Sequence, residues 1–289
     1  MIRTRILPPL IVALLVLPSC DVVIEPPDAI DAYFTLWGAL DPVSETQALR
    51  VVPILPDLEG DTSAPLDVTM TATDLVDGSQ FAWRDSLVEF DNGTSGHVFL
   101  ADFRPEYGRR YRIDVTRPDG ARTTANVRVP QIVEPFREET VFVPGDALLR
   151  IIWPGAPQLN RIEVTYLLQS NACDTPTVTI PFEGDAEPFE FGWMTTIRFA
   201  DDALRVLDEV GNSPHAVLLV TLSAEVASED GRLPGGVFDP EILIEPGTFS
   251  NVEHGFGFVG GAYPTSLTWR PEVDAINRTA FRIPGFSGC

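Results

Sequence analysis

Arg110-Tyr111-Arg112-Ile113-Asp114-Val115-Thr116 alternates charged or polar residues with apolar ones. A period of two is typical of a β-strand that buries one face and exposes the other. Tyr111, Ile113 and Val115 are therefore expected to point into a core. Pro118-Asp119-Gly120 follows directly and is a turn signal, so the chain should reverse there into a second strand.

The same pattern recurs on both sides of this stretch. Short apolar or alternating runs occupy residues 34–40, 49–55, 68–73, 81–88, 97–103 and 124–129, with turn signals such as Asp77-Gly78 and Asp91-Asn92-Gly93 between them. About seven short strands within about 100 residues are typical of an immunoglobulin-like sandwich. Residues 33–130 are therefore predicted to form an immunoglobulin-like or transthyretin-like β-sandwich.

The remaining residues predict a linker and a second β-rich domain. Residues 131–146 are rich in proline and acid and are interpreted as the linker, and 147–289 as the second domain. One helix is expected near residues 200–210: Asp201 and Asp202 suit its positive N-terminus, an apolar stripe follows, and Gly211 ends it. The predicted fold class is mainly β, with two antiparallel β-sandwich-like domains and one short helix in the second.

The N-terminus predicts export and lipidation. Arg3 and Arg5 precede a short apolar run over residues 6–17, and Leu17-Pro18-Ser19-Cys20 resembles a lipobox. Residues 1–19 are thus interpreted as a lipoprotein signal peptide and 20–32 as a tether, with Cys20 carrying palmitate-type acyl chains that hold the protein on a membrane. Stable anchoring needs at least two lipid signals, which a diacylated cysteine supplies. The alternative is an ordinary signal peptide that happens to contain a cysteine.

Charge and cysteine content exclude some functions. The chain has a formal net charge of −22 and contains no lysine, which argues against binding to nucleic acid or to anionic lipid. Apart from Cys20, only Cys173 and Cys289 are present. In an oxidising compartment the two could pair as a disulfide, and the alternative is two free thiols.

Signatures of catalysis are absent from the sequence. His97, His215 and His254 lie far apart and form no zinc motif, and no Gly-x-Ser-x-Gly elbow is found. Asp57, Glu59 and Asp61 could offer oxygens to calcium, but a solvated acidic loop is the stronger interpretation. The sequence therefore predicts a protein that is not an enzyme, with no metal and no cofactor.

Two segments are candidates for ligand binding. Phe189 and Phe191 alternate with acidic residues such as Glu187 and Glu190 in a loop that ends at Trp193, a combination that suits sugars and equally suits a half-buried strand. Further on, Gly255, Gly257, Gly260 and Gly261 permit close approach of another backbone. A tight strand packed under another element is favoured there over a ligand-contact loop.

Several segments resemble a known family. These are Cys20 with Val22-Val23-Ile24-Glu25, then Leu36-Trp37-Gly38-Ala39-Leu40, Tyr107-Gly108-Arg109-Arg110-Tyr111, and the segment Thr248-Phe249-Ser250-Asn251-Val252-Glu253-His254-Gly255-Phe256-Gly257-Phe258-Val259-Gly260. Together they resemble the Bacteroidota-type envelope lipoproteins grouped as domain of unknown function 4249. The resemblance implies an outer-membrane lipoprotein beside TonB-dependent receptors, and it implies no catalytic residues.

Three functions are left open. The first is a non-enzymatic binding or accessory module for an outer-membrane transport system of the TonB-dependent type. The second is a carbohydrate- or peptide-binding lipoprotein, favoured if Trp37, Trp83, Trp193 or Trp269 lies outside the core. The third is a hydrolase, which would need two carboxylates, or a carboxylate and a histidine, in one cleft. Asp21 resembles an inner-membrane retention signal, whereas the family resemblance favours the outer membrane.

Overall fold

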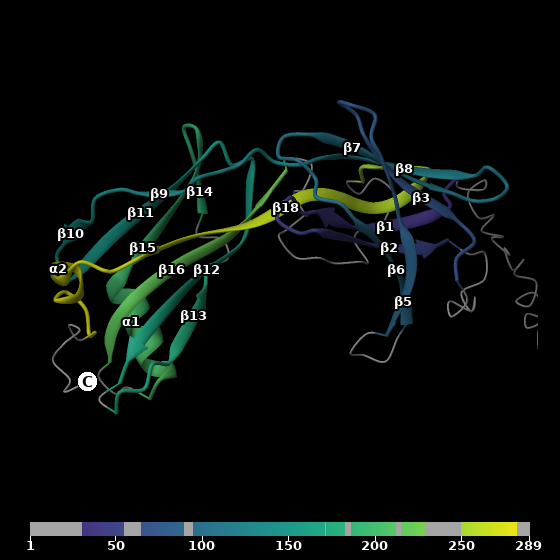
Figure 1. The fold of residues 1–289 in the computed structure, drawn as a ribbon. Coiled ribbons are helices and arrows are strands. Elements are labelled where there is room, and N and C mark those ends of the chain that lie inside the picture. Colours follow the sequence, from purple (N-terminus) through teal and green to yellow (C-terminus); the bar gives the residue numbers. More distant parts are fainter. Residues whose placement is uncertain are drawn as a thin grey trace, which may run out of the picture. The chain divides into compact units, whose positions relative to one another are not determined.

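The computed structural model describes residues 31–54, 65–89, 95–170, 172–182, 186–211, 215–228 and 250–281 (Figure 1). The chain forms two units, Met1–Asp31 and Ala32–Cys289, and the fold described below belongs to the second. The predicted signal peptide, Cys20, the acidic loop at residues 57–61 and Cys289 lie outside the described residues. No helix in the described ranges is long and apolar enough to cross a membrane.

The predicted first sandwich is present, and the quoted stretch lies at its centre. One of its sheets contains β1 (Phe34–Leu40), β2 (Thr46–Pro53), β6 (Ser95–Asp102) and β5 (Arg84–Glu89). The other contains β17 (Val252–Glu253), β8 (Arg122–Arg128), β7 (Arg110–Thr116), β3 (Thr69–Asp74) and β4 (Gln80–Ala82). Tyr111, Ile113 and Val115 of β7 are buried in the core between them, as the alternation predicts.

A tyrosine fixes the entry to β7. The Tyr111 hydroxyl accepts a hydrogen bond from the backbone N–H of Glu106 at 2.9 Å, five residues upstream. This is the geometry of the tyrosine corner in β-sandwiches. Arg109, in the same turn, forms ion pairs with Asp74 at 2.8 Å, with Asp77 at 2.7 Å and with Glu106.

The second sandwich also has two sheets. One contains β9 (Phe136–Arg137), β10 (Val141–Val143), β11 (Asp146–Pro154), β15 (Gly192–Arg198) and β14 (Ala186–Phe189). The other contains β13 (Thr177–Pro181), β12 (Gln158–Gln169), β16 (Ala216–Ala227) and the end of β18 (Gly255–Trp269). Residues 131–146, expected to be a linker, thus contribute β9 and β10, which pair with β11.

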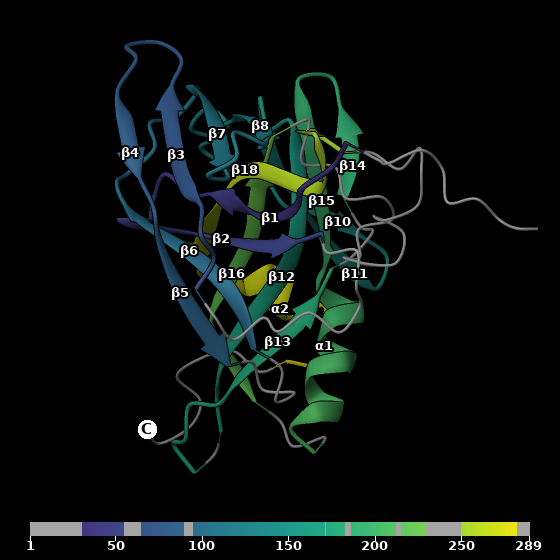
Figure 2. The same cartoon turned by 90° about the vertical axis from the view of Figure 1, so that its right-hand side faces the viewer.

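One strand belongs to both sandwiches. The first part of β18, from Gly255 to Gly261, runs parallel to β1, and the remainder pairs antiparallel with β16 (Figures 1 and 2). Val259 packs in the first core, whereas Tyr263 and Trp269 pack in the second. The first sandwich therefore does not end at the expected linker, residues 131–146. Two segments from beyond that linker belong to it: β17, which pairs with β8, and the start of β18, which pairs with β1.

The glycines of β18 permit the backbone to approach its neighbours closely. Gly257 has φ +95°, and a Cβ atom there would lie 2.2 Å from the carbonyl oxygen of Leu36. At Gly261 a Cβ would lie 2.4 Å from the carbonyl oxygen of Arg128. Only glycine fits such approaches. The interpretation of this segment as a tight strand under another element is confirmed.

The predicted helix is α1 (Phe199–Glu209), and it lies beside β13 (Figure 2). Its first turn is capped from another element: Asp146 Oδ1 accepts the backbone N–H of Ala200 at 2.9 Å, and the side chain of Arg198 makes no cap. A second helix, α2 (Val273–Ile276), is a single turn that the sequence did not predict.

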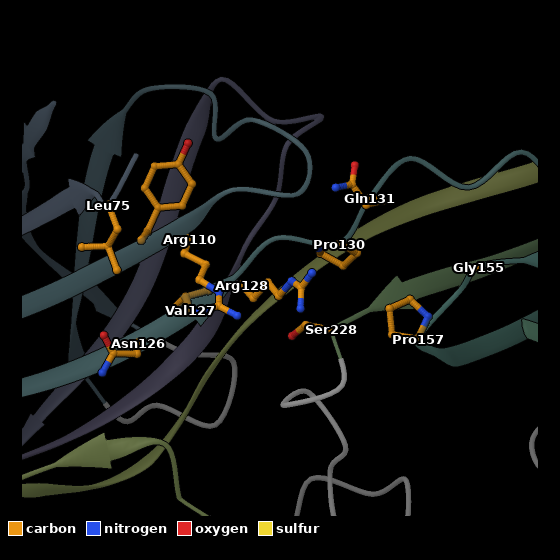
Figure 3. Close-up of a pocket in the computed structure, with 11 residues that line it drawn as sticks. Leu75, Arg110, Asn126, Val127, Arg128, Pro130, Gln131, Gly155, Pro157 and Ser228 are labelled. Carbon is orange, nitrogen blue, oxygen red and sulfur yellow. The ribbon is translucent and has the colours of Figure 1, made fainter. Parts of the chain in front are cut away.

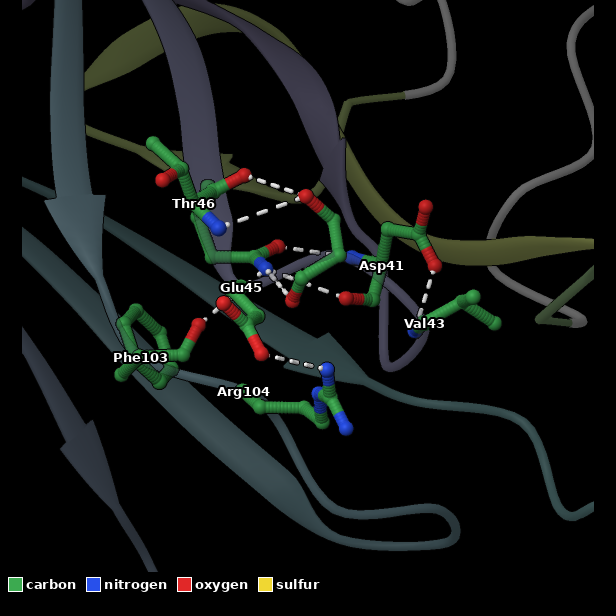
Figure 4. A network of polar contacts seen from close by, with 8 residues as sticks. Asp41, Val43, Glu45, Thr46, Phe103 and Arg104 are labelled. Atoms are coloured by element: carbon green, nitrogen blue, oxygen red, sulfur yellow. Dashed lines mark hydrogen bonds and ion pairs between the residues drawn. The ribbon is translucent and has the colours of Figure 1, made fainter.

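A network of polar contacts holds the turn between β1 and β2 (Figure 4). One buried amide organises it. Gln47, 1% exposed, donates from Nε2 to the carbonyls of Asp41, Ser44 and Phe103 at 3.0–3.2 Å. Its Oε1 accepts the Asp41 backbone N–H at 2.8 Å. On the surface beside it, Arg104 and Glu45 form an ion pair at 3.0 Å. The turn is held from inside because every polar atom of the amide is used.

Candidate functional site

The predicted aromatic cluster lies at the hairpin between β14 and β15. The rings of Phe189 and Phe191 meet edge to face, with centroids 5.0 Å apart. Trp193 is half-buried, packs on the second core and donates from Nε1 to the carbonyl of Pro157 at 3.1 Å. Phe191 is 54% exposed. The structure therefore brings the two phenylalanines together but directs the tryptophan toward the core, and the three rings do not form one open platform.

The tryptophans that the sequence singled out are divided between core and surface. Trp83 is buried in the first core and Trp269 in the second. Trp193 is half-buried as described, and Trp37 is half-buried as well. Trp37 differs from Trp193 because it lines a cavity, so it is the tryptophan best placed to contact a ligand.

The cavity at Trp37, called here the Trp37 cavity, has a volume of about 270 Å³. Trp37 on β1 stands in register with Phe258 on β18, and both aromatic residues line it. Small residues and three polar side chains complete the lining: Gly38, Ala39, Ala227, Gly260, Gly261 and Ala262, with Asn160, Arg161 and Glu225. The volume is near the lower limit of about 300 Å³ for small-molecule pockets, which suits a ligand of about one sugar ring.

The polar side of the cavity is built by a β-bulge. The pairing of β12 with β16 shifts register between Asn160 and Glu163, and Arg161 within the shift has φ +47°. Bulges re-aim side chains and are frequent beside functional sites, and a positive φ is uncommon for a residue other than glycine. Here the irregular backbone places Asn160 and Arg161 beside the same cavity.

Glu225 on β16 connects these two side chains. Its carboxylate accepts a hydrogen bond from Asn160 Nδ2 at 3.5 Å and forms an ion pair with Arg161 at 3.5 Å. Both contacts are long, so the groups retain capacity to bond a third partner. An amide, a guanidinium and a carboxylate together offer donors and acceptors beside an aromatic ring.

This combination can bind a sugar. An aromatic ring packs on the apolar C–H face of a pyranose, while carboxylate, amide and guanidinium groups bond its hydroxyls.

The backbone of β18 at this point is already hydrogen-bonded: the carbonyls of Gly257, Val259 and Gly261 accept hydrogen bonds from Ser250, Asn251 and Ser228, respectively. An extended peptide, which binds by pairing with a free strand edge, would find few free partners there.

The histidines do not gather at either of two cavities found in the described residues. His97 is buried, and its Nδ1 lies 2.9 Å from the carboxylate of Asp85. His215 is buried, and His254 is exposed in a turn with φ +53°. Across the described ranges, no three His, Cys, Asp or Glu residues are grouped to hold a metal. Among the described residues that line the two cavities, Glu225 is the one carboxylate and no histidine is present.

Cys173 is disulfide-bonded and adopts φ +67°. The other two cysteines, Cys20 and Cys289, lie outside the described residues. The pairing of Cys173 with Cys289 stays a prediction.

Comparisons with known proteins identify no family. No family model matches the chain, and no curated protein matches it. Among solved structures, a crystal structure of bovine butyrophilin is similar over 66% of this chain and 87% of that chain, with 13% sequence identity and a TM-score of 0.20. A TM-score at this level transfers neither fold detail nor function.

Proposed function

We propose that this protein is a lipid-anchored, non-enzymatic binding protein of the bacterial cell envelope that captures carbohydrate at the Trp37 cavity for an outer-membrane transport system. The observation that carries the proposal is the arrangement of Trp37 and Phe258 beside Asn160, Arg161 and Glu225 around one cavity. Lipidation of Cys20 and residence in the outer membrane are parts of the same proposal, supported by the N-terminal sequence and by the family resemblance.

Carbohydrate is favoured over peptide because the cavity offers side chains rather than a free strand edge. Six of its lining residues are glycine or alanine, so little side-chain volume competes with a sugar ring for the space beside the indole. Its rim supplies both donors and an acceptor, which a polyhydroxylated ligand requires. The aromatic and small residues thus select for the shape of the sugar ring, and the polar side chains select for the positions of its hydroxyl groups.

Glycan arrays probed with the full chain, purified from membranes in a neutral detergent, test this proposal. Trp37→Ala should abolish binding of any captured glycan, because the stacking surface is lost. Phe191→Ala, which removes an exposed aromatic ring elsewhere, should leave binding intact and is the matched control. Absence of any glycan ligand, or equal binding by the Trp37→Ala and unaltered proteins, would contradict the proposal.

An accessory role beside a TonB-dependent-type receptor is the second candidate. It is supported by exposed apolar residues on the short edge strands β9 and β10, namely Phe136, Val141 and Phe142. Exposed apolar residues on an edge strand favour contact with another protein. A mild-detergent pull-down from native membranes should then recover a β-barrel receptor in near-stoichiometric amount. A preparation that is free of such a receptor, together with a positive glycan array, would leave ligand capture as the sole role.

A further inference from the structure

A second and larger cavity has a volume of about 580 Å³ (Figure 3). Strands β7 and β8 supply one wall, and residues 75, 130–131, 155, 157 and 228 supply the remainder. No residue that lines it in the described part of the chain is acidic, although the chain contains 42 Asp and Glu residues. The two cavities have no lining residue in common.

Two arginines lie side by side on one wall of this cavity. Arg110 on β7 and Arg128 on β8 are direct cross-strand partners, and both line the cavity. Like charges placed directly opposite in a sheet destabilise it. Figure 3 shows the two side chains next to one another.

Within the described ranges, these arginines differ from their neighbours because no carboxylate pairs with them. Among the described residues neither Arg110 nor Arg128 forms an ion pair. On the same two strands, Arg112 and Arg122 both bond Asp114, whose pKa is lowered: burial raises it, but the hydrogen bonds from Arg122, Thr124 and Arg112 outweigh burial. In the described part of the chain, Asp114 thus neutralises the adjacent guanidinium groups of Arg112 and Arg122, and no carboxylate does so for Arg110 or Arg128.

The surroundings of the pair are polar and held in place. Asn126, Gln131 and Ser228 line the cavity together with apolar groups such as Val127 and Pro157. The backbone of Gln131 is fixed by Tyr263, whose hydroxyl donates to the Gln131 carbonyl at 2.9 Å and accepts the N–H of Val133 at 2.7 Å. A ligand would therefore meet a wall that is already positioned.

We infer that this cavity is a binding site for a small organic anion, held by its carboxylate, phosphate or sulfate group between Arg110 and Arg128. Guanidinium groups bind such oxyanions through paired, charge-assisted hydrogen bonds. A bound oxyanion would also remove the repulsion between the two arginines. The volume lies within the range of about 300–1,000 Å³ of small-molecule pockets, so the anionic group would belong to a molecule and not stand alone. This inference stands independently of carbohydrate capture at the Trp37 cavity.

Isothermal titration calorimetry on the full chain in neutral detergent tests the inference with four probes: citrate, galacturonate, inorganic phosphate and, as the neutral comparison, galactose. At least one organic anion should bind at low ionic strength, more tightly than inorganic phosphate, and weaken as salt is added. Arg110→Gln and Arg128→Gln should each weaken that binding about tenfold or more, since each removes a charge-assisted contact. Arg137→Gln is the matched control, because Arg137 is exposed on β9 outside the cavity.

A thermal-unfolding measurement separates ligand binding from a structural role. Without anions, both glutamine variants should unfold at or above the temperature of the unaltered chain, because a like-charge contact is relieved. With the bound anion present, only the unaltered chain and Arg137→Gln should gain stability. The inference is overturned if no anion binds, if phosphate alone binds as tightly as the organic anions, or if Arg137→Gln weakens binding as much as the other two variants.

Discussion

Replacing Asp202 by asparagine should make the protein more stable at neutral pH. Asp202 lies in the first turn of α1 but is only 2% exposed, and its carboxylate accepts a hydrogen bond from the Tyr166 hydroxyl at 2.5 Å. Burial raises the pKa of Asp202 to about 6; the hydrogen bond from Tyr166 and the charge of Arg205 oppose this rise only partly. A carboxylate that must ionise inside the fold reduces the free energy of unfolding.

The sign and size follow from proton linkage. In the folded state Asp202 holds its proton up to about pH 6, whereas in the unfolded chain it releases the proton near the ordinary pKa of 3.8. Between these values the folded state binds more protons at this side chain, so the contribution of Asp202 to stability falls as the pH rises. A difference of about two pKa units corresponds to about 3 kcal/mol. The Asp202→Asn side chain does not titrate, so this variant should not lose these roughly 3 kcal/mol as the pH rises.

Urea unfolding at a series of pH values from 4 to 7, followed by tryptophan fluorescence, measures the effect. The stability of Asp202→Asn minus that of the unaltered chain should grow by about 2–3 kcal/mol over this range, because the contributions of all other acids cancel in the difference. Asp201→Asn is the control: Asp201 is exposed and pairs with Arg198 at 3.0 Å, so its difference should stay within about 1 kcal/mol and rise little. A difference for Asp202→Asn that stays flat or shrinks with pH would refute the reasoning.

Three further substitutions test the packing. Gln47→Leu should lower the free energy of unfolding by about 3 kcal/mol, measured by urea titration, since it leaves buried backbone groups without partners; an unchanged midpoint would contradict this. Asp146→Ala should cost about 1–2 kcal/mol in the same assay by removing the cap of α1, and helix content from circular dichroism should fall with it. Gly257→Ala should destabilise by more than about 1 kcal/mol, because its Cβ would meet the carbonyl of Leu36 at positive φ. Gly120→Ala is the control, because Gly120 also has a positive φ but a Cβ there would meet no atom. The difference between the two variants therefore measures the clash apart from the backbone strain.

Local pattern was sufficient to predict the elements but not all their partners. The alternation around Tyr111 identified a strand and its buried face, because both depend on neighbouring residues alone. The position of α1 was also readable from its stripe and its ends. Asp202 was assigned to the helix dipole, however, and its burial depends on Tyr166 from a different strand. Such a contact leaves no periodic signal.

The candidate sites show the same limit. Trp37 was among the residues considered, yet Asn160, Arg161 and Glu225 reach it only through a bulge and through the pairing of β18 with two strands. In the sequence, nothing distinguishes Arg110 and Arg128 from the other arginines of their strands. Their opposition becomes visible only when the register of β7 and β8 is known.

The shared strand β18 has a consequence for the order in which the protein folds. Phe34 at the start of the first sandwich pairs with Gly255, near the end of the chain. During synthesis, which starts at the N-terminus, the first sandwich therefore cannot complete its sheet. One edge of β1 stays unpaired until β18 has been synthesised. Pairing between such distant segments is slow, because the entropy of loop closure is lost before the stabilising contacts form. We expect nascent chains truncated before residue 250 to remain protease-sensitive throughout, and the complete chain to acquire protection of both sandwiches in one step.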